Sequence, residues 1–352
     1  MQLVTIGQNQ AGQRLDKFLH KLLPQAGTGF MYKMLRKKNI TLNGKKAEGS
    51  EILVLGDQVR LFFAQETYEK FSGHSEEQYE RAYKELKDIR VVYEDDHVLI
   101  LDKPAGVLTQ KAQPGDVSLN EWMIGYLLEQ EEHFERELES FRPSVCNRLD
   151  RNTSGLVLCG KSLPGLQYLS SCIKLRQVRK FYRTICAGEL LNETTIKGYL
   201  VKDTERNKVH VVTGEEKAVA TEGEKSPADA AGRCLSGEEI ETAYRPIKTG
   251  GGYTLLEVEL ITGKPHQIRA HLASLGHPLI GDFKYGDLQI TKRLQNQYGL
   301  QHQLLHAFRV EFPQTEEPAG IHLSGKSITA PCPELFVRIQ KELRLEPGDA
   351  DV

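Results

Sequence analysis

The six cysteines of the chain are few and scattered, and no two of them form a Cys-x-x-Cys pair. A disulfide framework or a structural zinc site needs paired or regularly spaced cysteines, so neither is expected. We therefore interpret all six as free thiols. They are Cys146, Cys159, Cys172, Cys186, Cys234 and Cys332.

The chain also lacks long apolar runs and an excess of charge of either sign. Its first residues, MQLVTIGQNQAGQRLD, contain neither a basic leader nor an apolar core of secretory length, and no later stretch is apolar enough to span a bilayer. We therefore expect a cytoplasmic protein without a membrane partner. Lys and Arg number 46 against 48 Asp and Glu, a net charge of −2, so a surface for an acidic partner must come from local clusters.

One acid in the segment NRLDRNTSGLVL, residues 147–158, stands between two arginines. The Asn, Thr, Ser and Gly that follow it favour a turn, and the apolar run 156–158 then predicts a strand. Asp150 is therefore expected on a loop fixed to a strand, a position that suits a reactive group. The alternative is that Asp150 only caps the turn beside solvated arginines, and these residues fit it equally well.

A second segment, ITGKPHQIRAHLASLGHPLIGDFKYG at 261–286, predicts a short helix with clear ends. Pro265 suits its first turn, and Gly276 suits its end. Arg269 falls on a different face from the apolar stripe, so it is expected to point into a site. The stripe consists of Ile268, Leu272 and Leu275.

A third segment, KFYR at 180–183, begins a predicted strand. In strand alternation Tyr182 shares a face with Lys180, whereas Phe181 faces the other way, so the Tyr182 ring lies beside positive charge. A tyrosine in a strand is most often a core residue, and on these residues alone that alternative leads.

Together with YEDDHVLILDKPAGVLTQ at 93–110, these segments resemble the RluA-type pseudouridine synthases, and they follow the family's order. The resemblance covers 89–330 and implies an α+β fold, whose catalytic domain has a mixed, mainly antiparallel sheet and a central cleft. The chain departs from the family at Asn147, where His is common, and at Lys264 and Pro265, where Arg-Thr is common. Neither departure touches a residue with a catalytic role.

The resemblance implies that the protein converts uridine to pseudouridine in RNA. The bond from ribose to uracil nitrogen breaks, the base turns, and a carbon–carbon bond forms. No atoms are gained or lost, so no cofactor and no metal are expected. Asp150 would act as nucleophile or as the base that starts a sugar-centred elimination, Arg269 would keep it charged, and Tyr182 would stack on the uracil and assist proton removal.

A uridine in folded RNA must be unstacked to reach such a site, which predicts a deep pocket flanked by positive charge. Leu272 is expected to pack this pocket. Each flanking charge has the ordinary alternative of a solvated side chain without a contact. The flanking residues are Arg148, Arg151 and Lys180.

Residues 1–64 are expected to form a separate small α/β module with two helices and a hairpin turn at Asn43-Gly44. With RLDKFL and ITLNGKK, it resembles the RNA-binding domain first seen in ribosomal small-subunit protein four. Its basic residues are expected to form one face for a phosphate backbone, and the alternative is an ordinary solvated surface. They are Arg14, Lys17, Lys33, Arg36, Lys37, Lys38, Lys45 and Lys46.

The remaining segments carry less information. Residues 65–88 are polar and predict a linker or an exposed helix, before a catalytic domain at 89–330. Residues 119–141 predict a helical stretch with Trp122 in the core. A long surface loop is expected at 202–239 and a carboxy-terminal tail at 331–352.

The amino-terminal module favours large-subunit ribosomal RNA over transfer RNA as the substrate, and a chain that carries its own RNA-binding module is expected to act as a monomer. Two other functions stay open. A non-catalytic RNA-binding or ribosome-assembly protein would not need Asp, Tyr and Arg from three distant segments. A metal-free RNA hydrolase would pair Asp150 with His266 or His271 and would cut the RNA.

Overall fold

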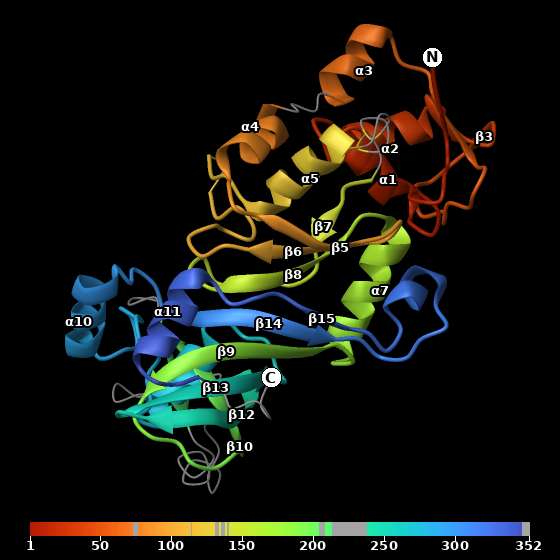
Figure 1. The fold of residues 1–352 in the computed structure, drawn as a ribbon. Coiled ribbons are helices and arrows are strands. Elements are labelled where there is room, and N and C mark those ends of the chain that lie inside the picture. Colours follow the sequence, from red (N-terminus) through yellow and green to blue (C-terminus); the bar gives the residue numbers. More distant parts are fainter. Residues whose placement is uncertain are drawn as a thin grey trace, which may run out of the picture.

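The computed structural model contains two sheets, a four-stranded one near the amino terminus and an 11-stranded one in the rest of the chain. Figure 1 shows the small module, in red and orange, beside one end of the larger domain. In the part of the chain that the structure describes, no helix is both long and apolar enough to cross a membrane. The described residues are 1–72, 77–113, 115–130, 134, 138, 141–203, 208–212 and 238–346.

The amino-terminal module contains the expected two helices and hairpin, on a sheet with the strand order β1-β4-β2-β3. The first helix has an apolar stripe that is fully buried, which explains why this short segment folds as a helix; the stripe consists of Leu15, Phe18, Leu19 and Leu22. Asn43 and Gly44 have φ of 51° and 73°, the positive values that a tight hairpin turn needs. The elements are β1 (Gln2–Thr5), α1 (Leu15–Leu22), α2 (Thr28–Arg36), β2 (Ile40–Leu42), β3 (Lys45–Lys46) and β4 (Gln58–Leu61).

The segment 65–88 forms two helices, and the second is part of the catalytic core. Of the two alternatives for this segment the helix is the one observed, but Tyr79 and Ala82, three residues apart on one face, are buried, so the helix is not exposed on all sides. A Cβ at Gly125 would lie 2.5 Å from the carbonyl oxygen of Tyr79, so glycine permits a close backbone approach to the next helix. The helices are α3 (Gln65–Ser72), α4 (Glu77–Glu85) and α5 (Leu119–Gln130).

The large sheet has the order β11-β10-β12-β13-β9-β14-β8-β6-β5, with β7 beside β8 and β15 beside β14. All its pairings are antiparallel except that of β14 with β8, so the predicted mixed, mainly antiparallel sheet of an α+β fold is confirmed. The strands are β5 (Arg90–Glu94), β6 (Val98–Lys103), β7 (Ser144–Val145), β8 (Ser154–Gly160), β9 (Arg179–Ala187), β10 (Thr194–Asp203), β11 (Lys208–Val212), β12 (Glu238–Gly250), β13 (Tyr253–Leu260), β14 (Leu305–Glu311) and β15 (Ser327–Thr329).

The parallel junction between β8 and β14 requires a glycine. Gly155 has a φ of 111°, and a Cβ there would lie 2.2 Å from the carbonyl oxygen of Ala307. Ser154 and His306 face each other at the same junction, with Oγ and Nδ1 2.9 Å apart. The loop that carries Asp150 runs directly into this close contact, so the start of β8 holds the loop in place.

Helices cover both faces of the sheet. The larger core cluster joins α4, α5 and α9 to the sheet and contains Trp122, whose predicted core position is confirmed. A second cluster packs α7 on the other face, where the Ser162 side chain caps α7 by accepting the N–H of Gly165. The helices are α7 (Leu163–Lys174), α9 (Gln267–Ser274), α10 (Leu288–Tyr298), the 3-10 turn η1 (Pro318–Leu323) and α11 (Glu334–Glu342).

Three expectations need correction. The predicted tail contains the helix α11. Its Phe336 and Ile339 lie three residues apart, on one face of the helix, and are buried in a core cluster with residues of the large sheet. Within 202–239, residues 208–212 form β11, which extends the sheet as a hairpin with β10. Leu275, predicted in the buried stripe of α9, is 39% exposed because the helix ends one residue before it.

Some expectations fall on residues outside the described ranges. These are Cys234, the segments 204–207 and 213–237, most of the acidic end of 119–141, and the chain after 346. The other five cysteines are free thiols, and burial raises the pKa of each of them.

Replacing Phe336 by Ala tests whether α11 belongs to the folded domain. The side chain is 2% exposed, so its removal should lower the free energy of unfolding by about 3–5 kcal/mol. The exposed neighbour Glu334 provides the control, and Glu334→Ala should change it by less than about 0.5 kcal/mol. Equal denaturant midpoints for the two variants would contradict the placement of α11 in the core.

Candidate active site

Asp150 lies on a loop before β8, as the turn residues predict. Two neighbours fix the loop: the Thr109 hydroxyl donates to the carbonyl oxygen of Leu149 at 2.8 Å, and Thr153 N–H donates to the carbonyl oxygen of Asp150 at 3.0 Å. The Asp150 side chain is 24% exposed, so the carboxylate reaches the surface of a pocket.

Arg269, on α9, is the main partner of this carboxylate. Its Nη1 donates to Asp150 Oδ2 at 2.9 Å, as the position on α9 predicts. Its other two nitrogens donate hydrogen bonds to the Asp282 carboxylate, Nε at 2.7 Å and Nη2 at 3.0 Å. Burial lowers the pKa of Arg269, but the two carboxylates outweigh burial and raise it above its usual value, so the guanidinium is charged.

Asp282 is a site residue that the sequence analysis does not single out. Its side chain is fully buried and also accepts the backbone N–H groups of Lys284 and Tyr285. Burial raises the pKa of Asp282, but Arg269 and these N–H groups together hold it below the usual value. Its signal in the sequence is the Gly281-Asp282 turn inside the Arg269 segment.

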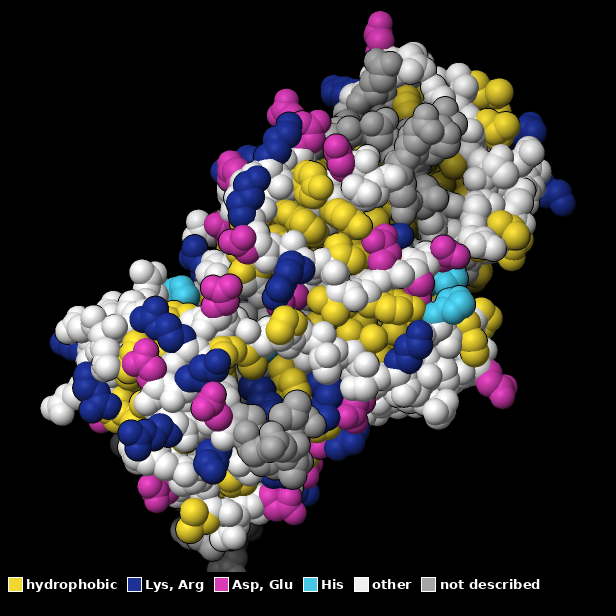
Figure 2. Space-filling view, in the orientation of Figure 1, with side chains coloured by type: hydrophobic (Ala, Val, Ile, Leu, Met, Phe, Trp, Pro, Cys, Tyr) yellow, Lys and Arg dark blue, Asp and Glu magenta, His cyan; other side chains and the backbone are white. Residues whose placement is uncertain are grey.

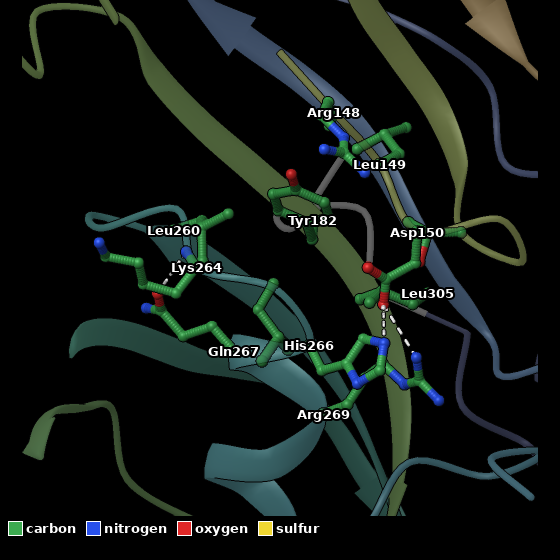
Figure 3. A pocket seen from close by; sticks show the side chains of 12 residues that line it. Arg148, Leu149, Asp150, Tyr182, Leu260, Lys264, His266, Gln267, Arg269 and Leu305 are labelled. Carbon is green, nitrogen blue, oxygen red and sulfur yellow. Dashed lines mark hydrogen bonds and ion pairs between the residues drawn. The ribbon is translucent and has the colours of Figure 1, made fainter. Parts of the chain in front are cut away.

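Tyr182 lies on β9 and lines the same pocket as Asp150, with only 5% of its surface exposed. Burial, together with the nearby charge of Asp150, raises the pKa of its hydroxyl well above the usual value, so the phenol stays protonated. Figure 3 shows the arrangement: Asp150, His266 and Arg269 point toward one another, and Tyr182 stands at the side of the pocket. Leu272 does not line the pocket; it is fully buried in the core cluster that contains Tyr182.

The pocket opens into a groove of about 1160 Å³ that is lined by the predicted flanking residues Arg148, Arg151 and Lys180. Lys174 and Arg176, at the end of α7, also line this groove and were not predicted. The eight basic residues predicted to contact RNA in the amino-terminal module are all exposed, but none lines the groove. Figure 2 shows Lys and Arg interspersed with Asp and Glu on the face it displays, in keeping with the small net charge.

The two faces of β9 hold their cations differently. On the face away from Tyr182, Arg179 pairs with Glu259 and Glu311, and Arg183 pairs with Glu257. On the Tyr182 face, Lys180 is partly buried and has no carboxylate partner among the described residues. Burial, with a smaller contribution from Arg176, lowers the pKa of Lys180. An anion in the groove would therefore meet a cation that is not already neutralised.

Lys103 is a further residue that the sequence did not predict at the site. It is fully buried, and its Nζ donates to the carbonyl oxygens of Pro104, Val107 and Arg151 at 2.9–3.1 Å. Burial lowers the pKa of Lys103 to about 7, although Asp150 and Asp102 oppose this effect. The lysine thus ties the turn after β6 to the Asp150 loop. A lysine at the end of the apolar run VLILDK is the available signal.

Within the described residues, no three His, Cys, Asp or Glu side chains gather in a way that could hold a metal ion. His271, one of the two histidines of the hydrolase alternative, is buried, and its Nδ1 lies 3.1 Å from the Thr242 hydroxyl. The other, His266, has its Nε2 3.9 Å from Asp150 Oδ2.

A family model described as RNA pseudouridylate synthase matches residues 97–274. Ribosomal large subunit pseudouridine synthase C of Vibrio vulnificus is 30% identical over 98% of this chain and 97% of its own. The protein of the same name from Escherichia coli is 29% identical over 98% and 97%. A solved structure titled human RNA pseudouridylate synthase domain containing 4 aligns with a TM-score of 0.56 at 19% identity, over 76% of this chain and 97% of its own, and supports the fold.

The match to the RNA pseudouridylate synthase model and the named relatives show an RNA-modifying isomerase, and its mainly antiparallel sheet places an arginine-bound aspartate and a tyrosine in one groove. The chain belongs to the RNA pseudouridylate synthase family, in its RluA-type branch, and is an RNA pseudouridine synthase. The resemblance read from the three motifs is confirmed.

Replacing Asp282 by Asn should lower the free energy of unfolding at pH 7 by about 3–5 kcal/mol, because Arg269 loses a buried charged partner. The exposed Asp96→Asn is the control and should change little. The pKa of Asp282 is held low, so its contribution is complete above the unfolded pKa of about 3.9 and is lost as pH falls through the folded value. In urea unfolding, the difference in free energy of unfolding between wild type and Asp282→Asn should therefore shrink as the pH falls toward 3. A difference that stays constant from pH 7 to pH 3 would contradict this account.

Proposed function

We propose that this protein isomerises specific uridines to pseudouridine in large-subunit ribosomal RNA. Relatives of about 30% identity over nearly the full chain are named as ribosomal large subunit pseudouridine synthases, which favours this RNA over transfer RNA. We further propose that the enzyme acts in the cytoplasm, where this RNA is found, as a monomer and without a cofactor.

Asp150 is the proposed reactive group, either as the nucleophile or as the base that starts elimination. The observation that carries the proposal is the 2.9 Å contact between Asp150 and Arg269, two residues 119 positions apart, at the mouth of a pocket that Tyr182 also lines. A guanidinium at this distance fixes the direction of the carboxylate through a charge-assisted hydrogen bond. Tyr182 is proposed to stack on the uracil and to assist removal of the proton from the rearranged base.

The groove is the proposed path of the RNA chain. A flipped uridine would enter the pocket while its neighbouring phosphates stay in the groove beside Arg148, Arg151 and Lys180. Lys180 has the strongest support, because its ammonium is partly buried without a carboxylate partner among the described residues. The amino-terminal module, bounded at residues 1–64, is proposed to add a second phosphate contact through its exposed basic residues.

Asp150→Asn tests the proposed substrate and reactive group together. Pseudouridine is mapped in total RNA from cells that lack the gene and from the same cells restored with wild type, Asp150→Asn or the control Asp96→Asn. Specific sites in large-subunit ribosomal RNA should vanish on deletion and return with wild type and the control only, because Asn cannot attack or accept a proton as a carboxylate does. Loss of transfer-RNA sites instead would overturn the proposed substrate. Full restoration by Asp150→Asn would overturn the role of Asp150.

Lys180→Met tests the proposed groove contact. Affinity for a large-subunit RNA fragment is measured over a range of salt concentrations in an Asp150→Asn background, so that no turnover occurs. Loss of one phosphate contact should reduce the slope of log affinity against log salt by about one. The exposed Lys341, on α11 and outside the groove, provides the control, and Lys341→Met should keep the wild-type slope. An unchanged slope for Lys180→Met would refute the contact.

A further inference from the structure

His266 has an unusual backbone at the start of α9. Its φ of 57° and ψ of 13° lie in the left-handed region, which a residue other than glycine adopts rarely and only where its surroundings hold it. This conformation aims the imidazole at Asp150 on one side and at Tyr285 on the other, and Figure 3 shows the side of Asp150. The strained residue therefore bridges the reactive carboxylate and a tyrosine outside the pocket.

The hydrogen-bond partners of His266 decide where its proton lies. Nδ1 is 2.9 Å from the Tyr285 hydroxyl oxygen and 3.4 Å from Nζ of Lys284, and an ammonium can only donate. The Tyr285 oxygen accepts the backbone N–H of Val209 at 3.1 Å, and at 2.9 Å its hydroxyl can donate to Nδ1. Nδ1 is therefore the acceptor, and the proton of the neutral ring sits on Nε2.

The charge of the ring fits this tautomer. Burial lowers the pKa of His266, and the facing cations Arg269 and Lys284 lower it further, whereas Asp150 and Asp282 raise it. The net pKa lies below the usual 6.5, so the imidazole is neutral at pH 7.

Both donors of the site address the same oxygen of Asp150. Nε2 of His266 lies 3.9 Å from Oδ2, and Nη1 of Arg269 lies 2.9 Å from that same atom. Among the described residues, no group donates a hydrogen bond to Oδ1. Oδ2 thus accepts a hydrogen bond from Arg269 and faces Nε2 of His266 at a separation longer than a hydrogen bond, whereas Oδ1 is available to a substrate.

We propose that His266 is a positioning residue which, as the Nε2–H tautomer held by Tyr285, anchors Oδ2 together with Arg269 and so presents Oδ1 as the reacting oxygen. The inference rests on the proposed role of Asp150 and holds whether Oδ1 attacks or removes a proton. The proposed Nε2–H···Oδ2 hydrogen bond belongs to the substrate complex, because the separation here is 3.9 Å and catalytic hydrogen bonds are often longer before substrate binds. It also gives β11 a role, because Val209 orients Tyr285.

Two substitutions at His266 separate its side chain from its backbone. His266→Gly removes the imidazole and tolerates the left-handed conformation, so the start of α9 is not strained further. His266→Gln retains an N–H donor near the position of Nε2. Single-turnover pseudouridine formation and RNA affinity are measured separately on large-subunit ribosomal RNA. The Gly variant should react about 10- to 100-fold more slowly with little change in affinity, and Gln should restore most of the rate.

A double-mutant cycle tests whether the Tyr285 hydroxyl holds His266 in the Nε2–H tautomer. Tyr285→Phe should slow the reaction in the wild-type background and have little further effect beside His266→Gly, because the hydroxyl acts through the imidazole. His277, whose Nδ1 bonds a backbone carbonyl oxygen away from the site, provides the control, and His277→Gln should keep the wild-type rate. Thermal unfolding of each variant separates a loss of fold from a loss of rate.

The outcomes are distinguishable. Wild-type rates for His266→Gly, or equal slowing by Tyr285→Phe in both backgrounds, would overturn the positioning role while leaving the proposed function intact. A rate that falls with Gly and does not recover with Gln would overturn the donor role of Nε2. If wild type forms no pseudouridine in large-subunit ribosomal RNA, the proposed function fails, and the inference fails with it.

Discussion

A buried guanidinium between two carboxylates governs the geometry of this site. Arg269 is charged and almost enclosed, and burying a charge costs several kcal/mol unless partners and hydrogen bonds compensate for it. The fully buried Asp282 accepts two hydrogen bonds from Arg269, and this bidentate pairing fixes the plane of the guanidinium. The remaining donor then has one direction to point, and Asp150 lies there. The direction of the Asp150 carboxylate thus depends on Asp282, which does not itself line the pocket.

The sheet makes this arrangement rigid. β8 delivers the Asp150 loop, β9 delivers Tyr182, and β14 lies between these two strands in the sheet. The contact of Gly155 with Ala307 leaves little room for the loop to shift at the start of β8. Strand alternation on β9 also divides the cations, since Arg179 and Arg183 are neutralised by glutamates on one face while Lys180 faces the groove. A single strand therefore contributes both to stability and to the surface offered to an anion.

Patterns of local sequence predicted much of the fold. The turn at Asn43-Gly44, the strand after Asp150 and the existence of α9 before Gly276 follow from spacing and turn chemistry, and the structure agrees. Pro265, expected in the first turn of α9, instead precedes its N-cap residue His266. Two predictions failed for different reasons. α4 exposes most of its surface and buries only Tyr79 and Ala82, so its segment reads as polar until its partner helix is known. α11 has an amphipathic sequence with Phe336 and Ile339 on its buried face, a pattern that the prediction of a tail did not take into account.

The sequence by itself determined which chemical groups are present: an acid in a turn, an arginine off the apolar face of a helix, and a tyrosine beside a lysine on a strand. Only the tertiary structure decided that Asp282 grips Arg269, that Lys103 ties two loops together, and that His266 faces the same oxygen as Arg269. The physical reason is that side-chain direction within one element follows local periodicity, whereas distances between elements depend on how the whole sheet pairs and packs.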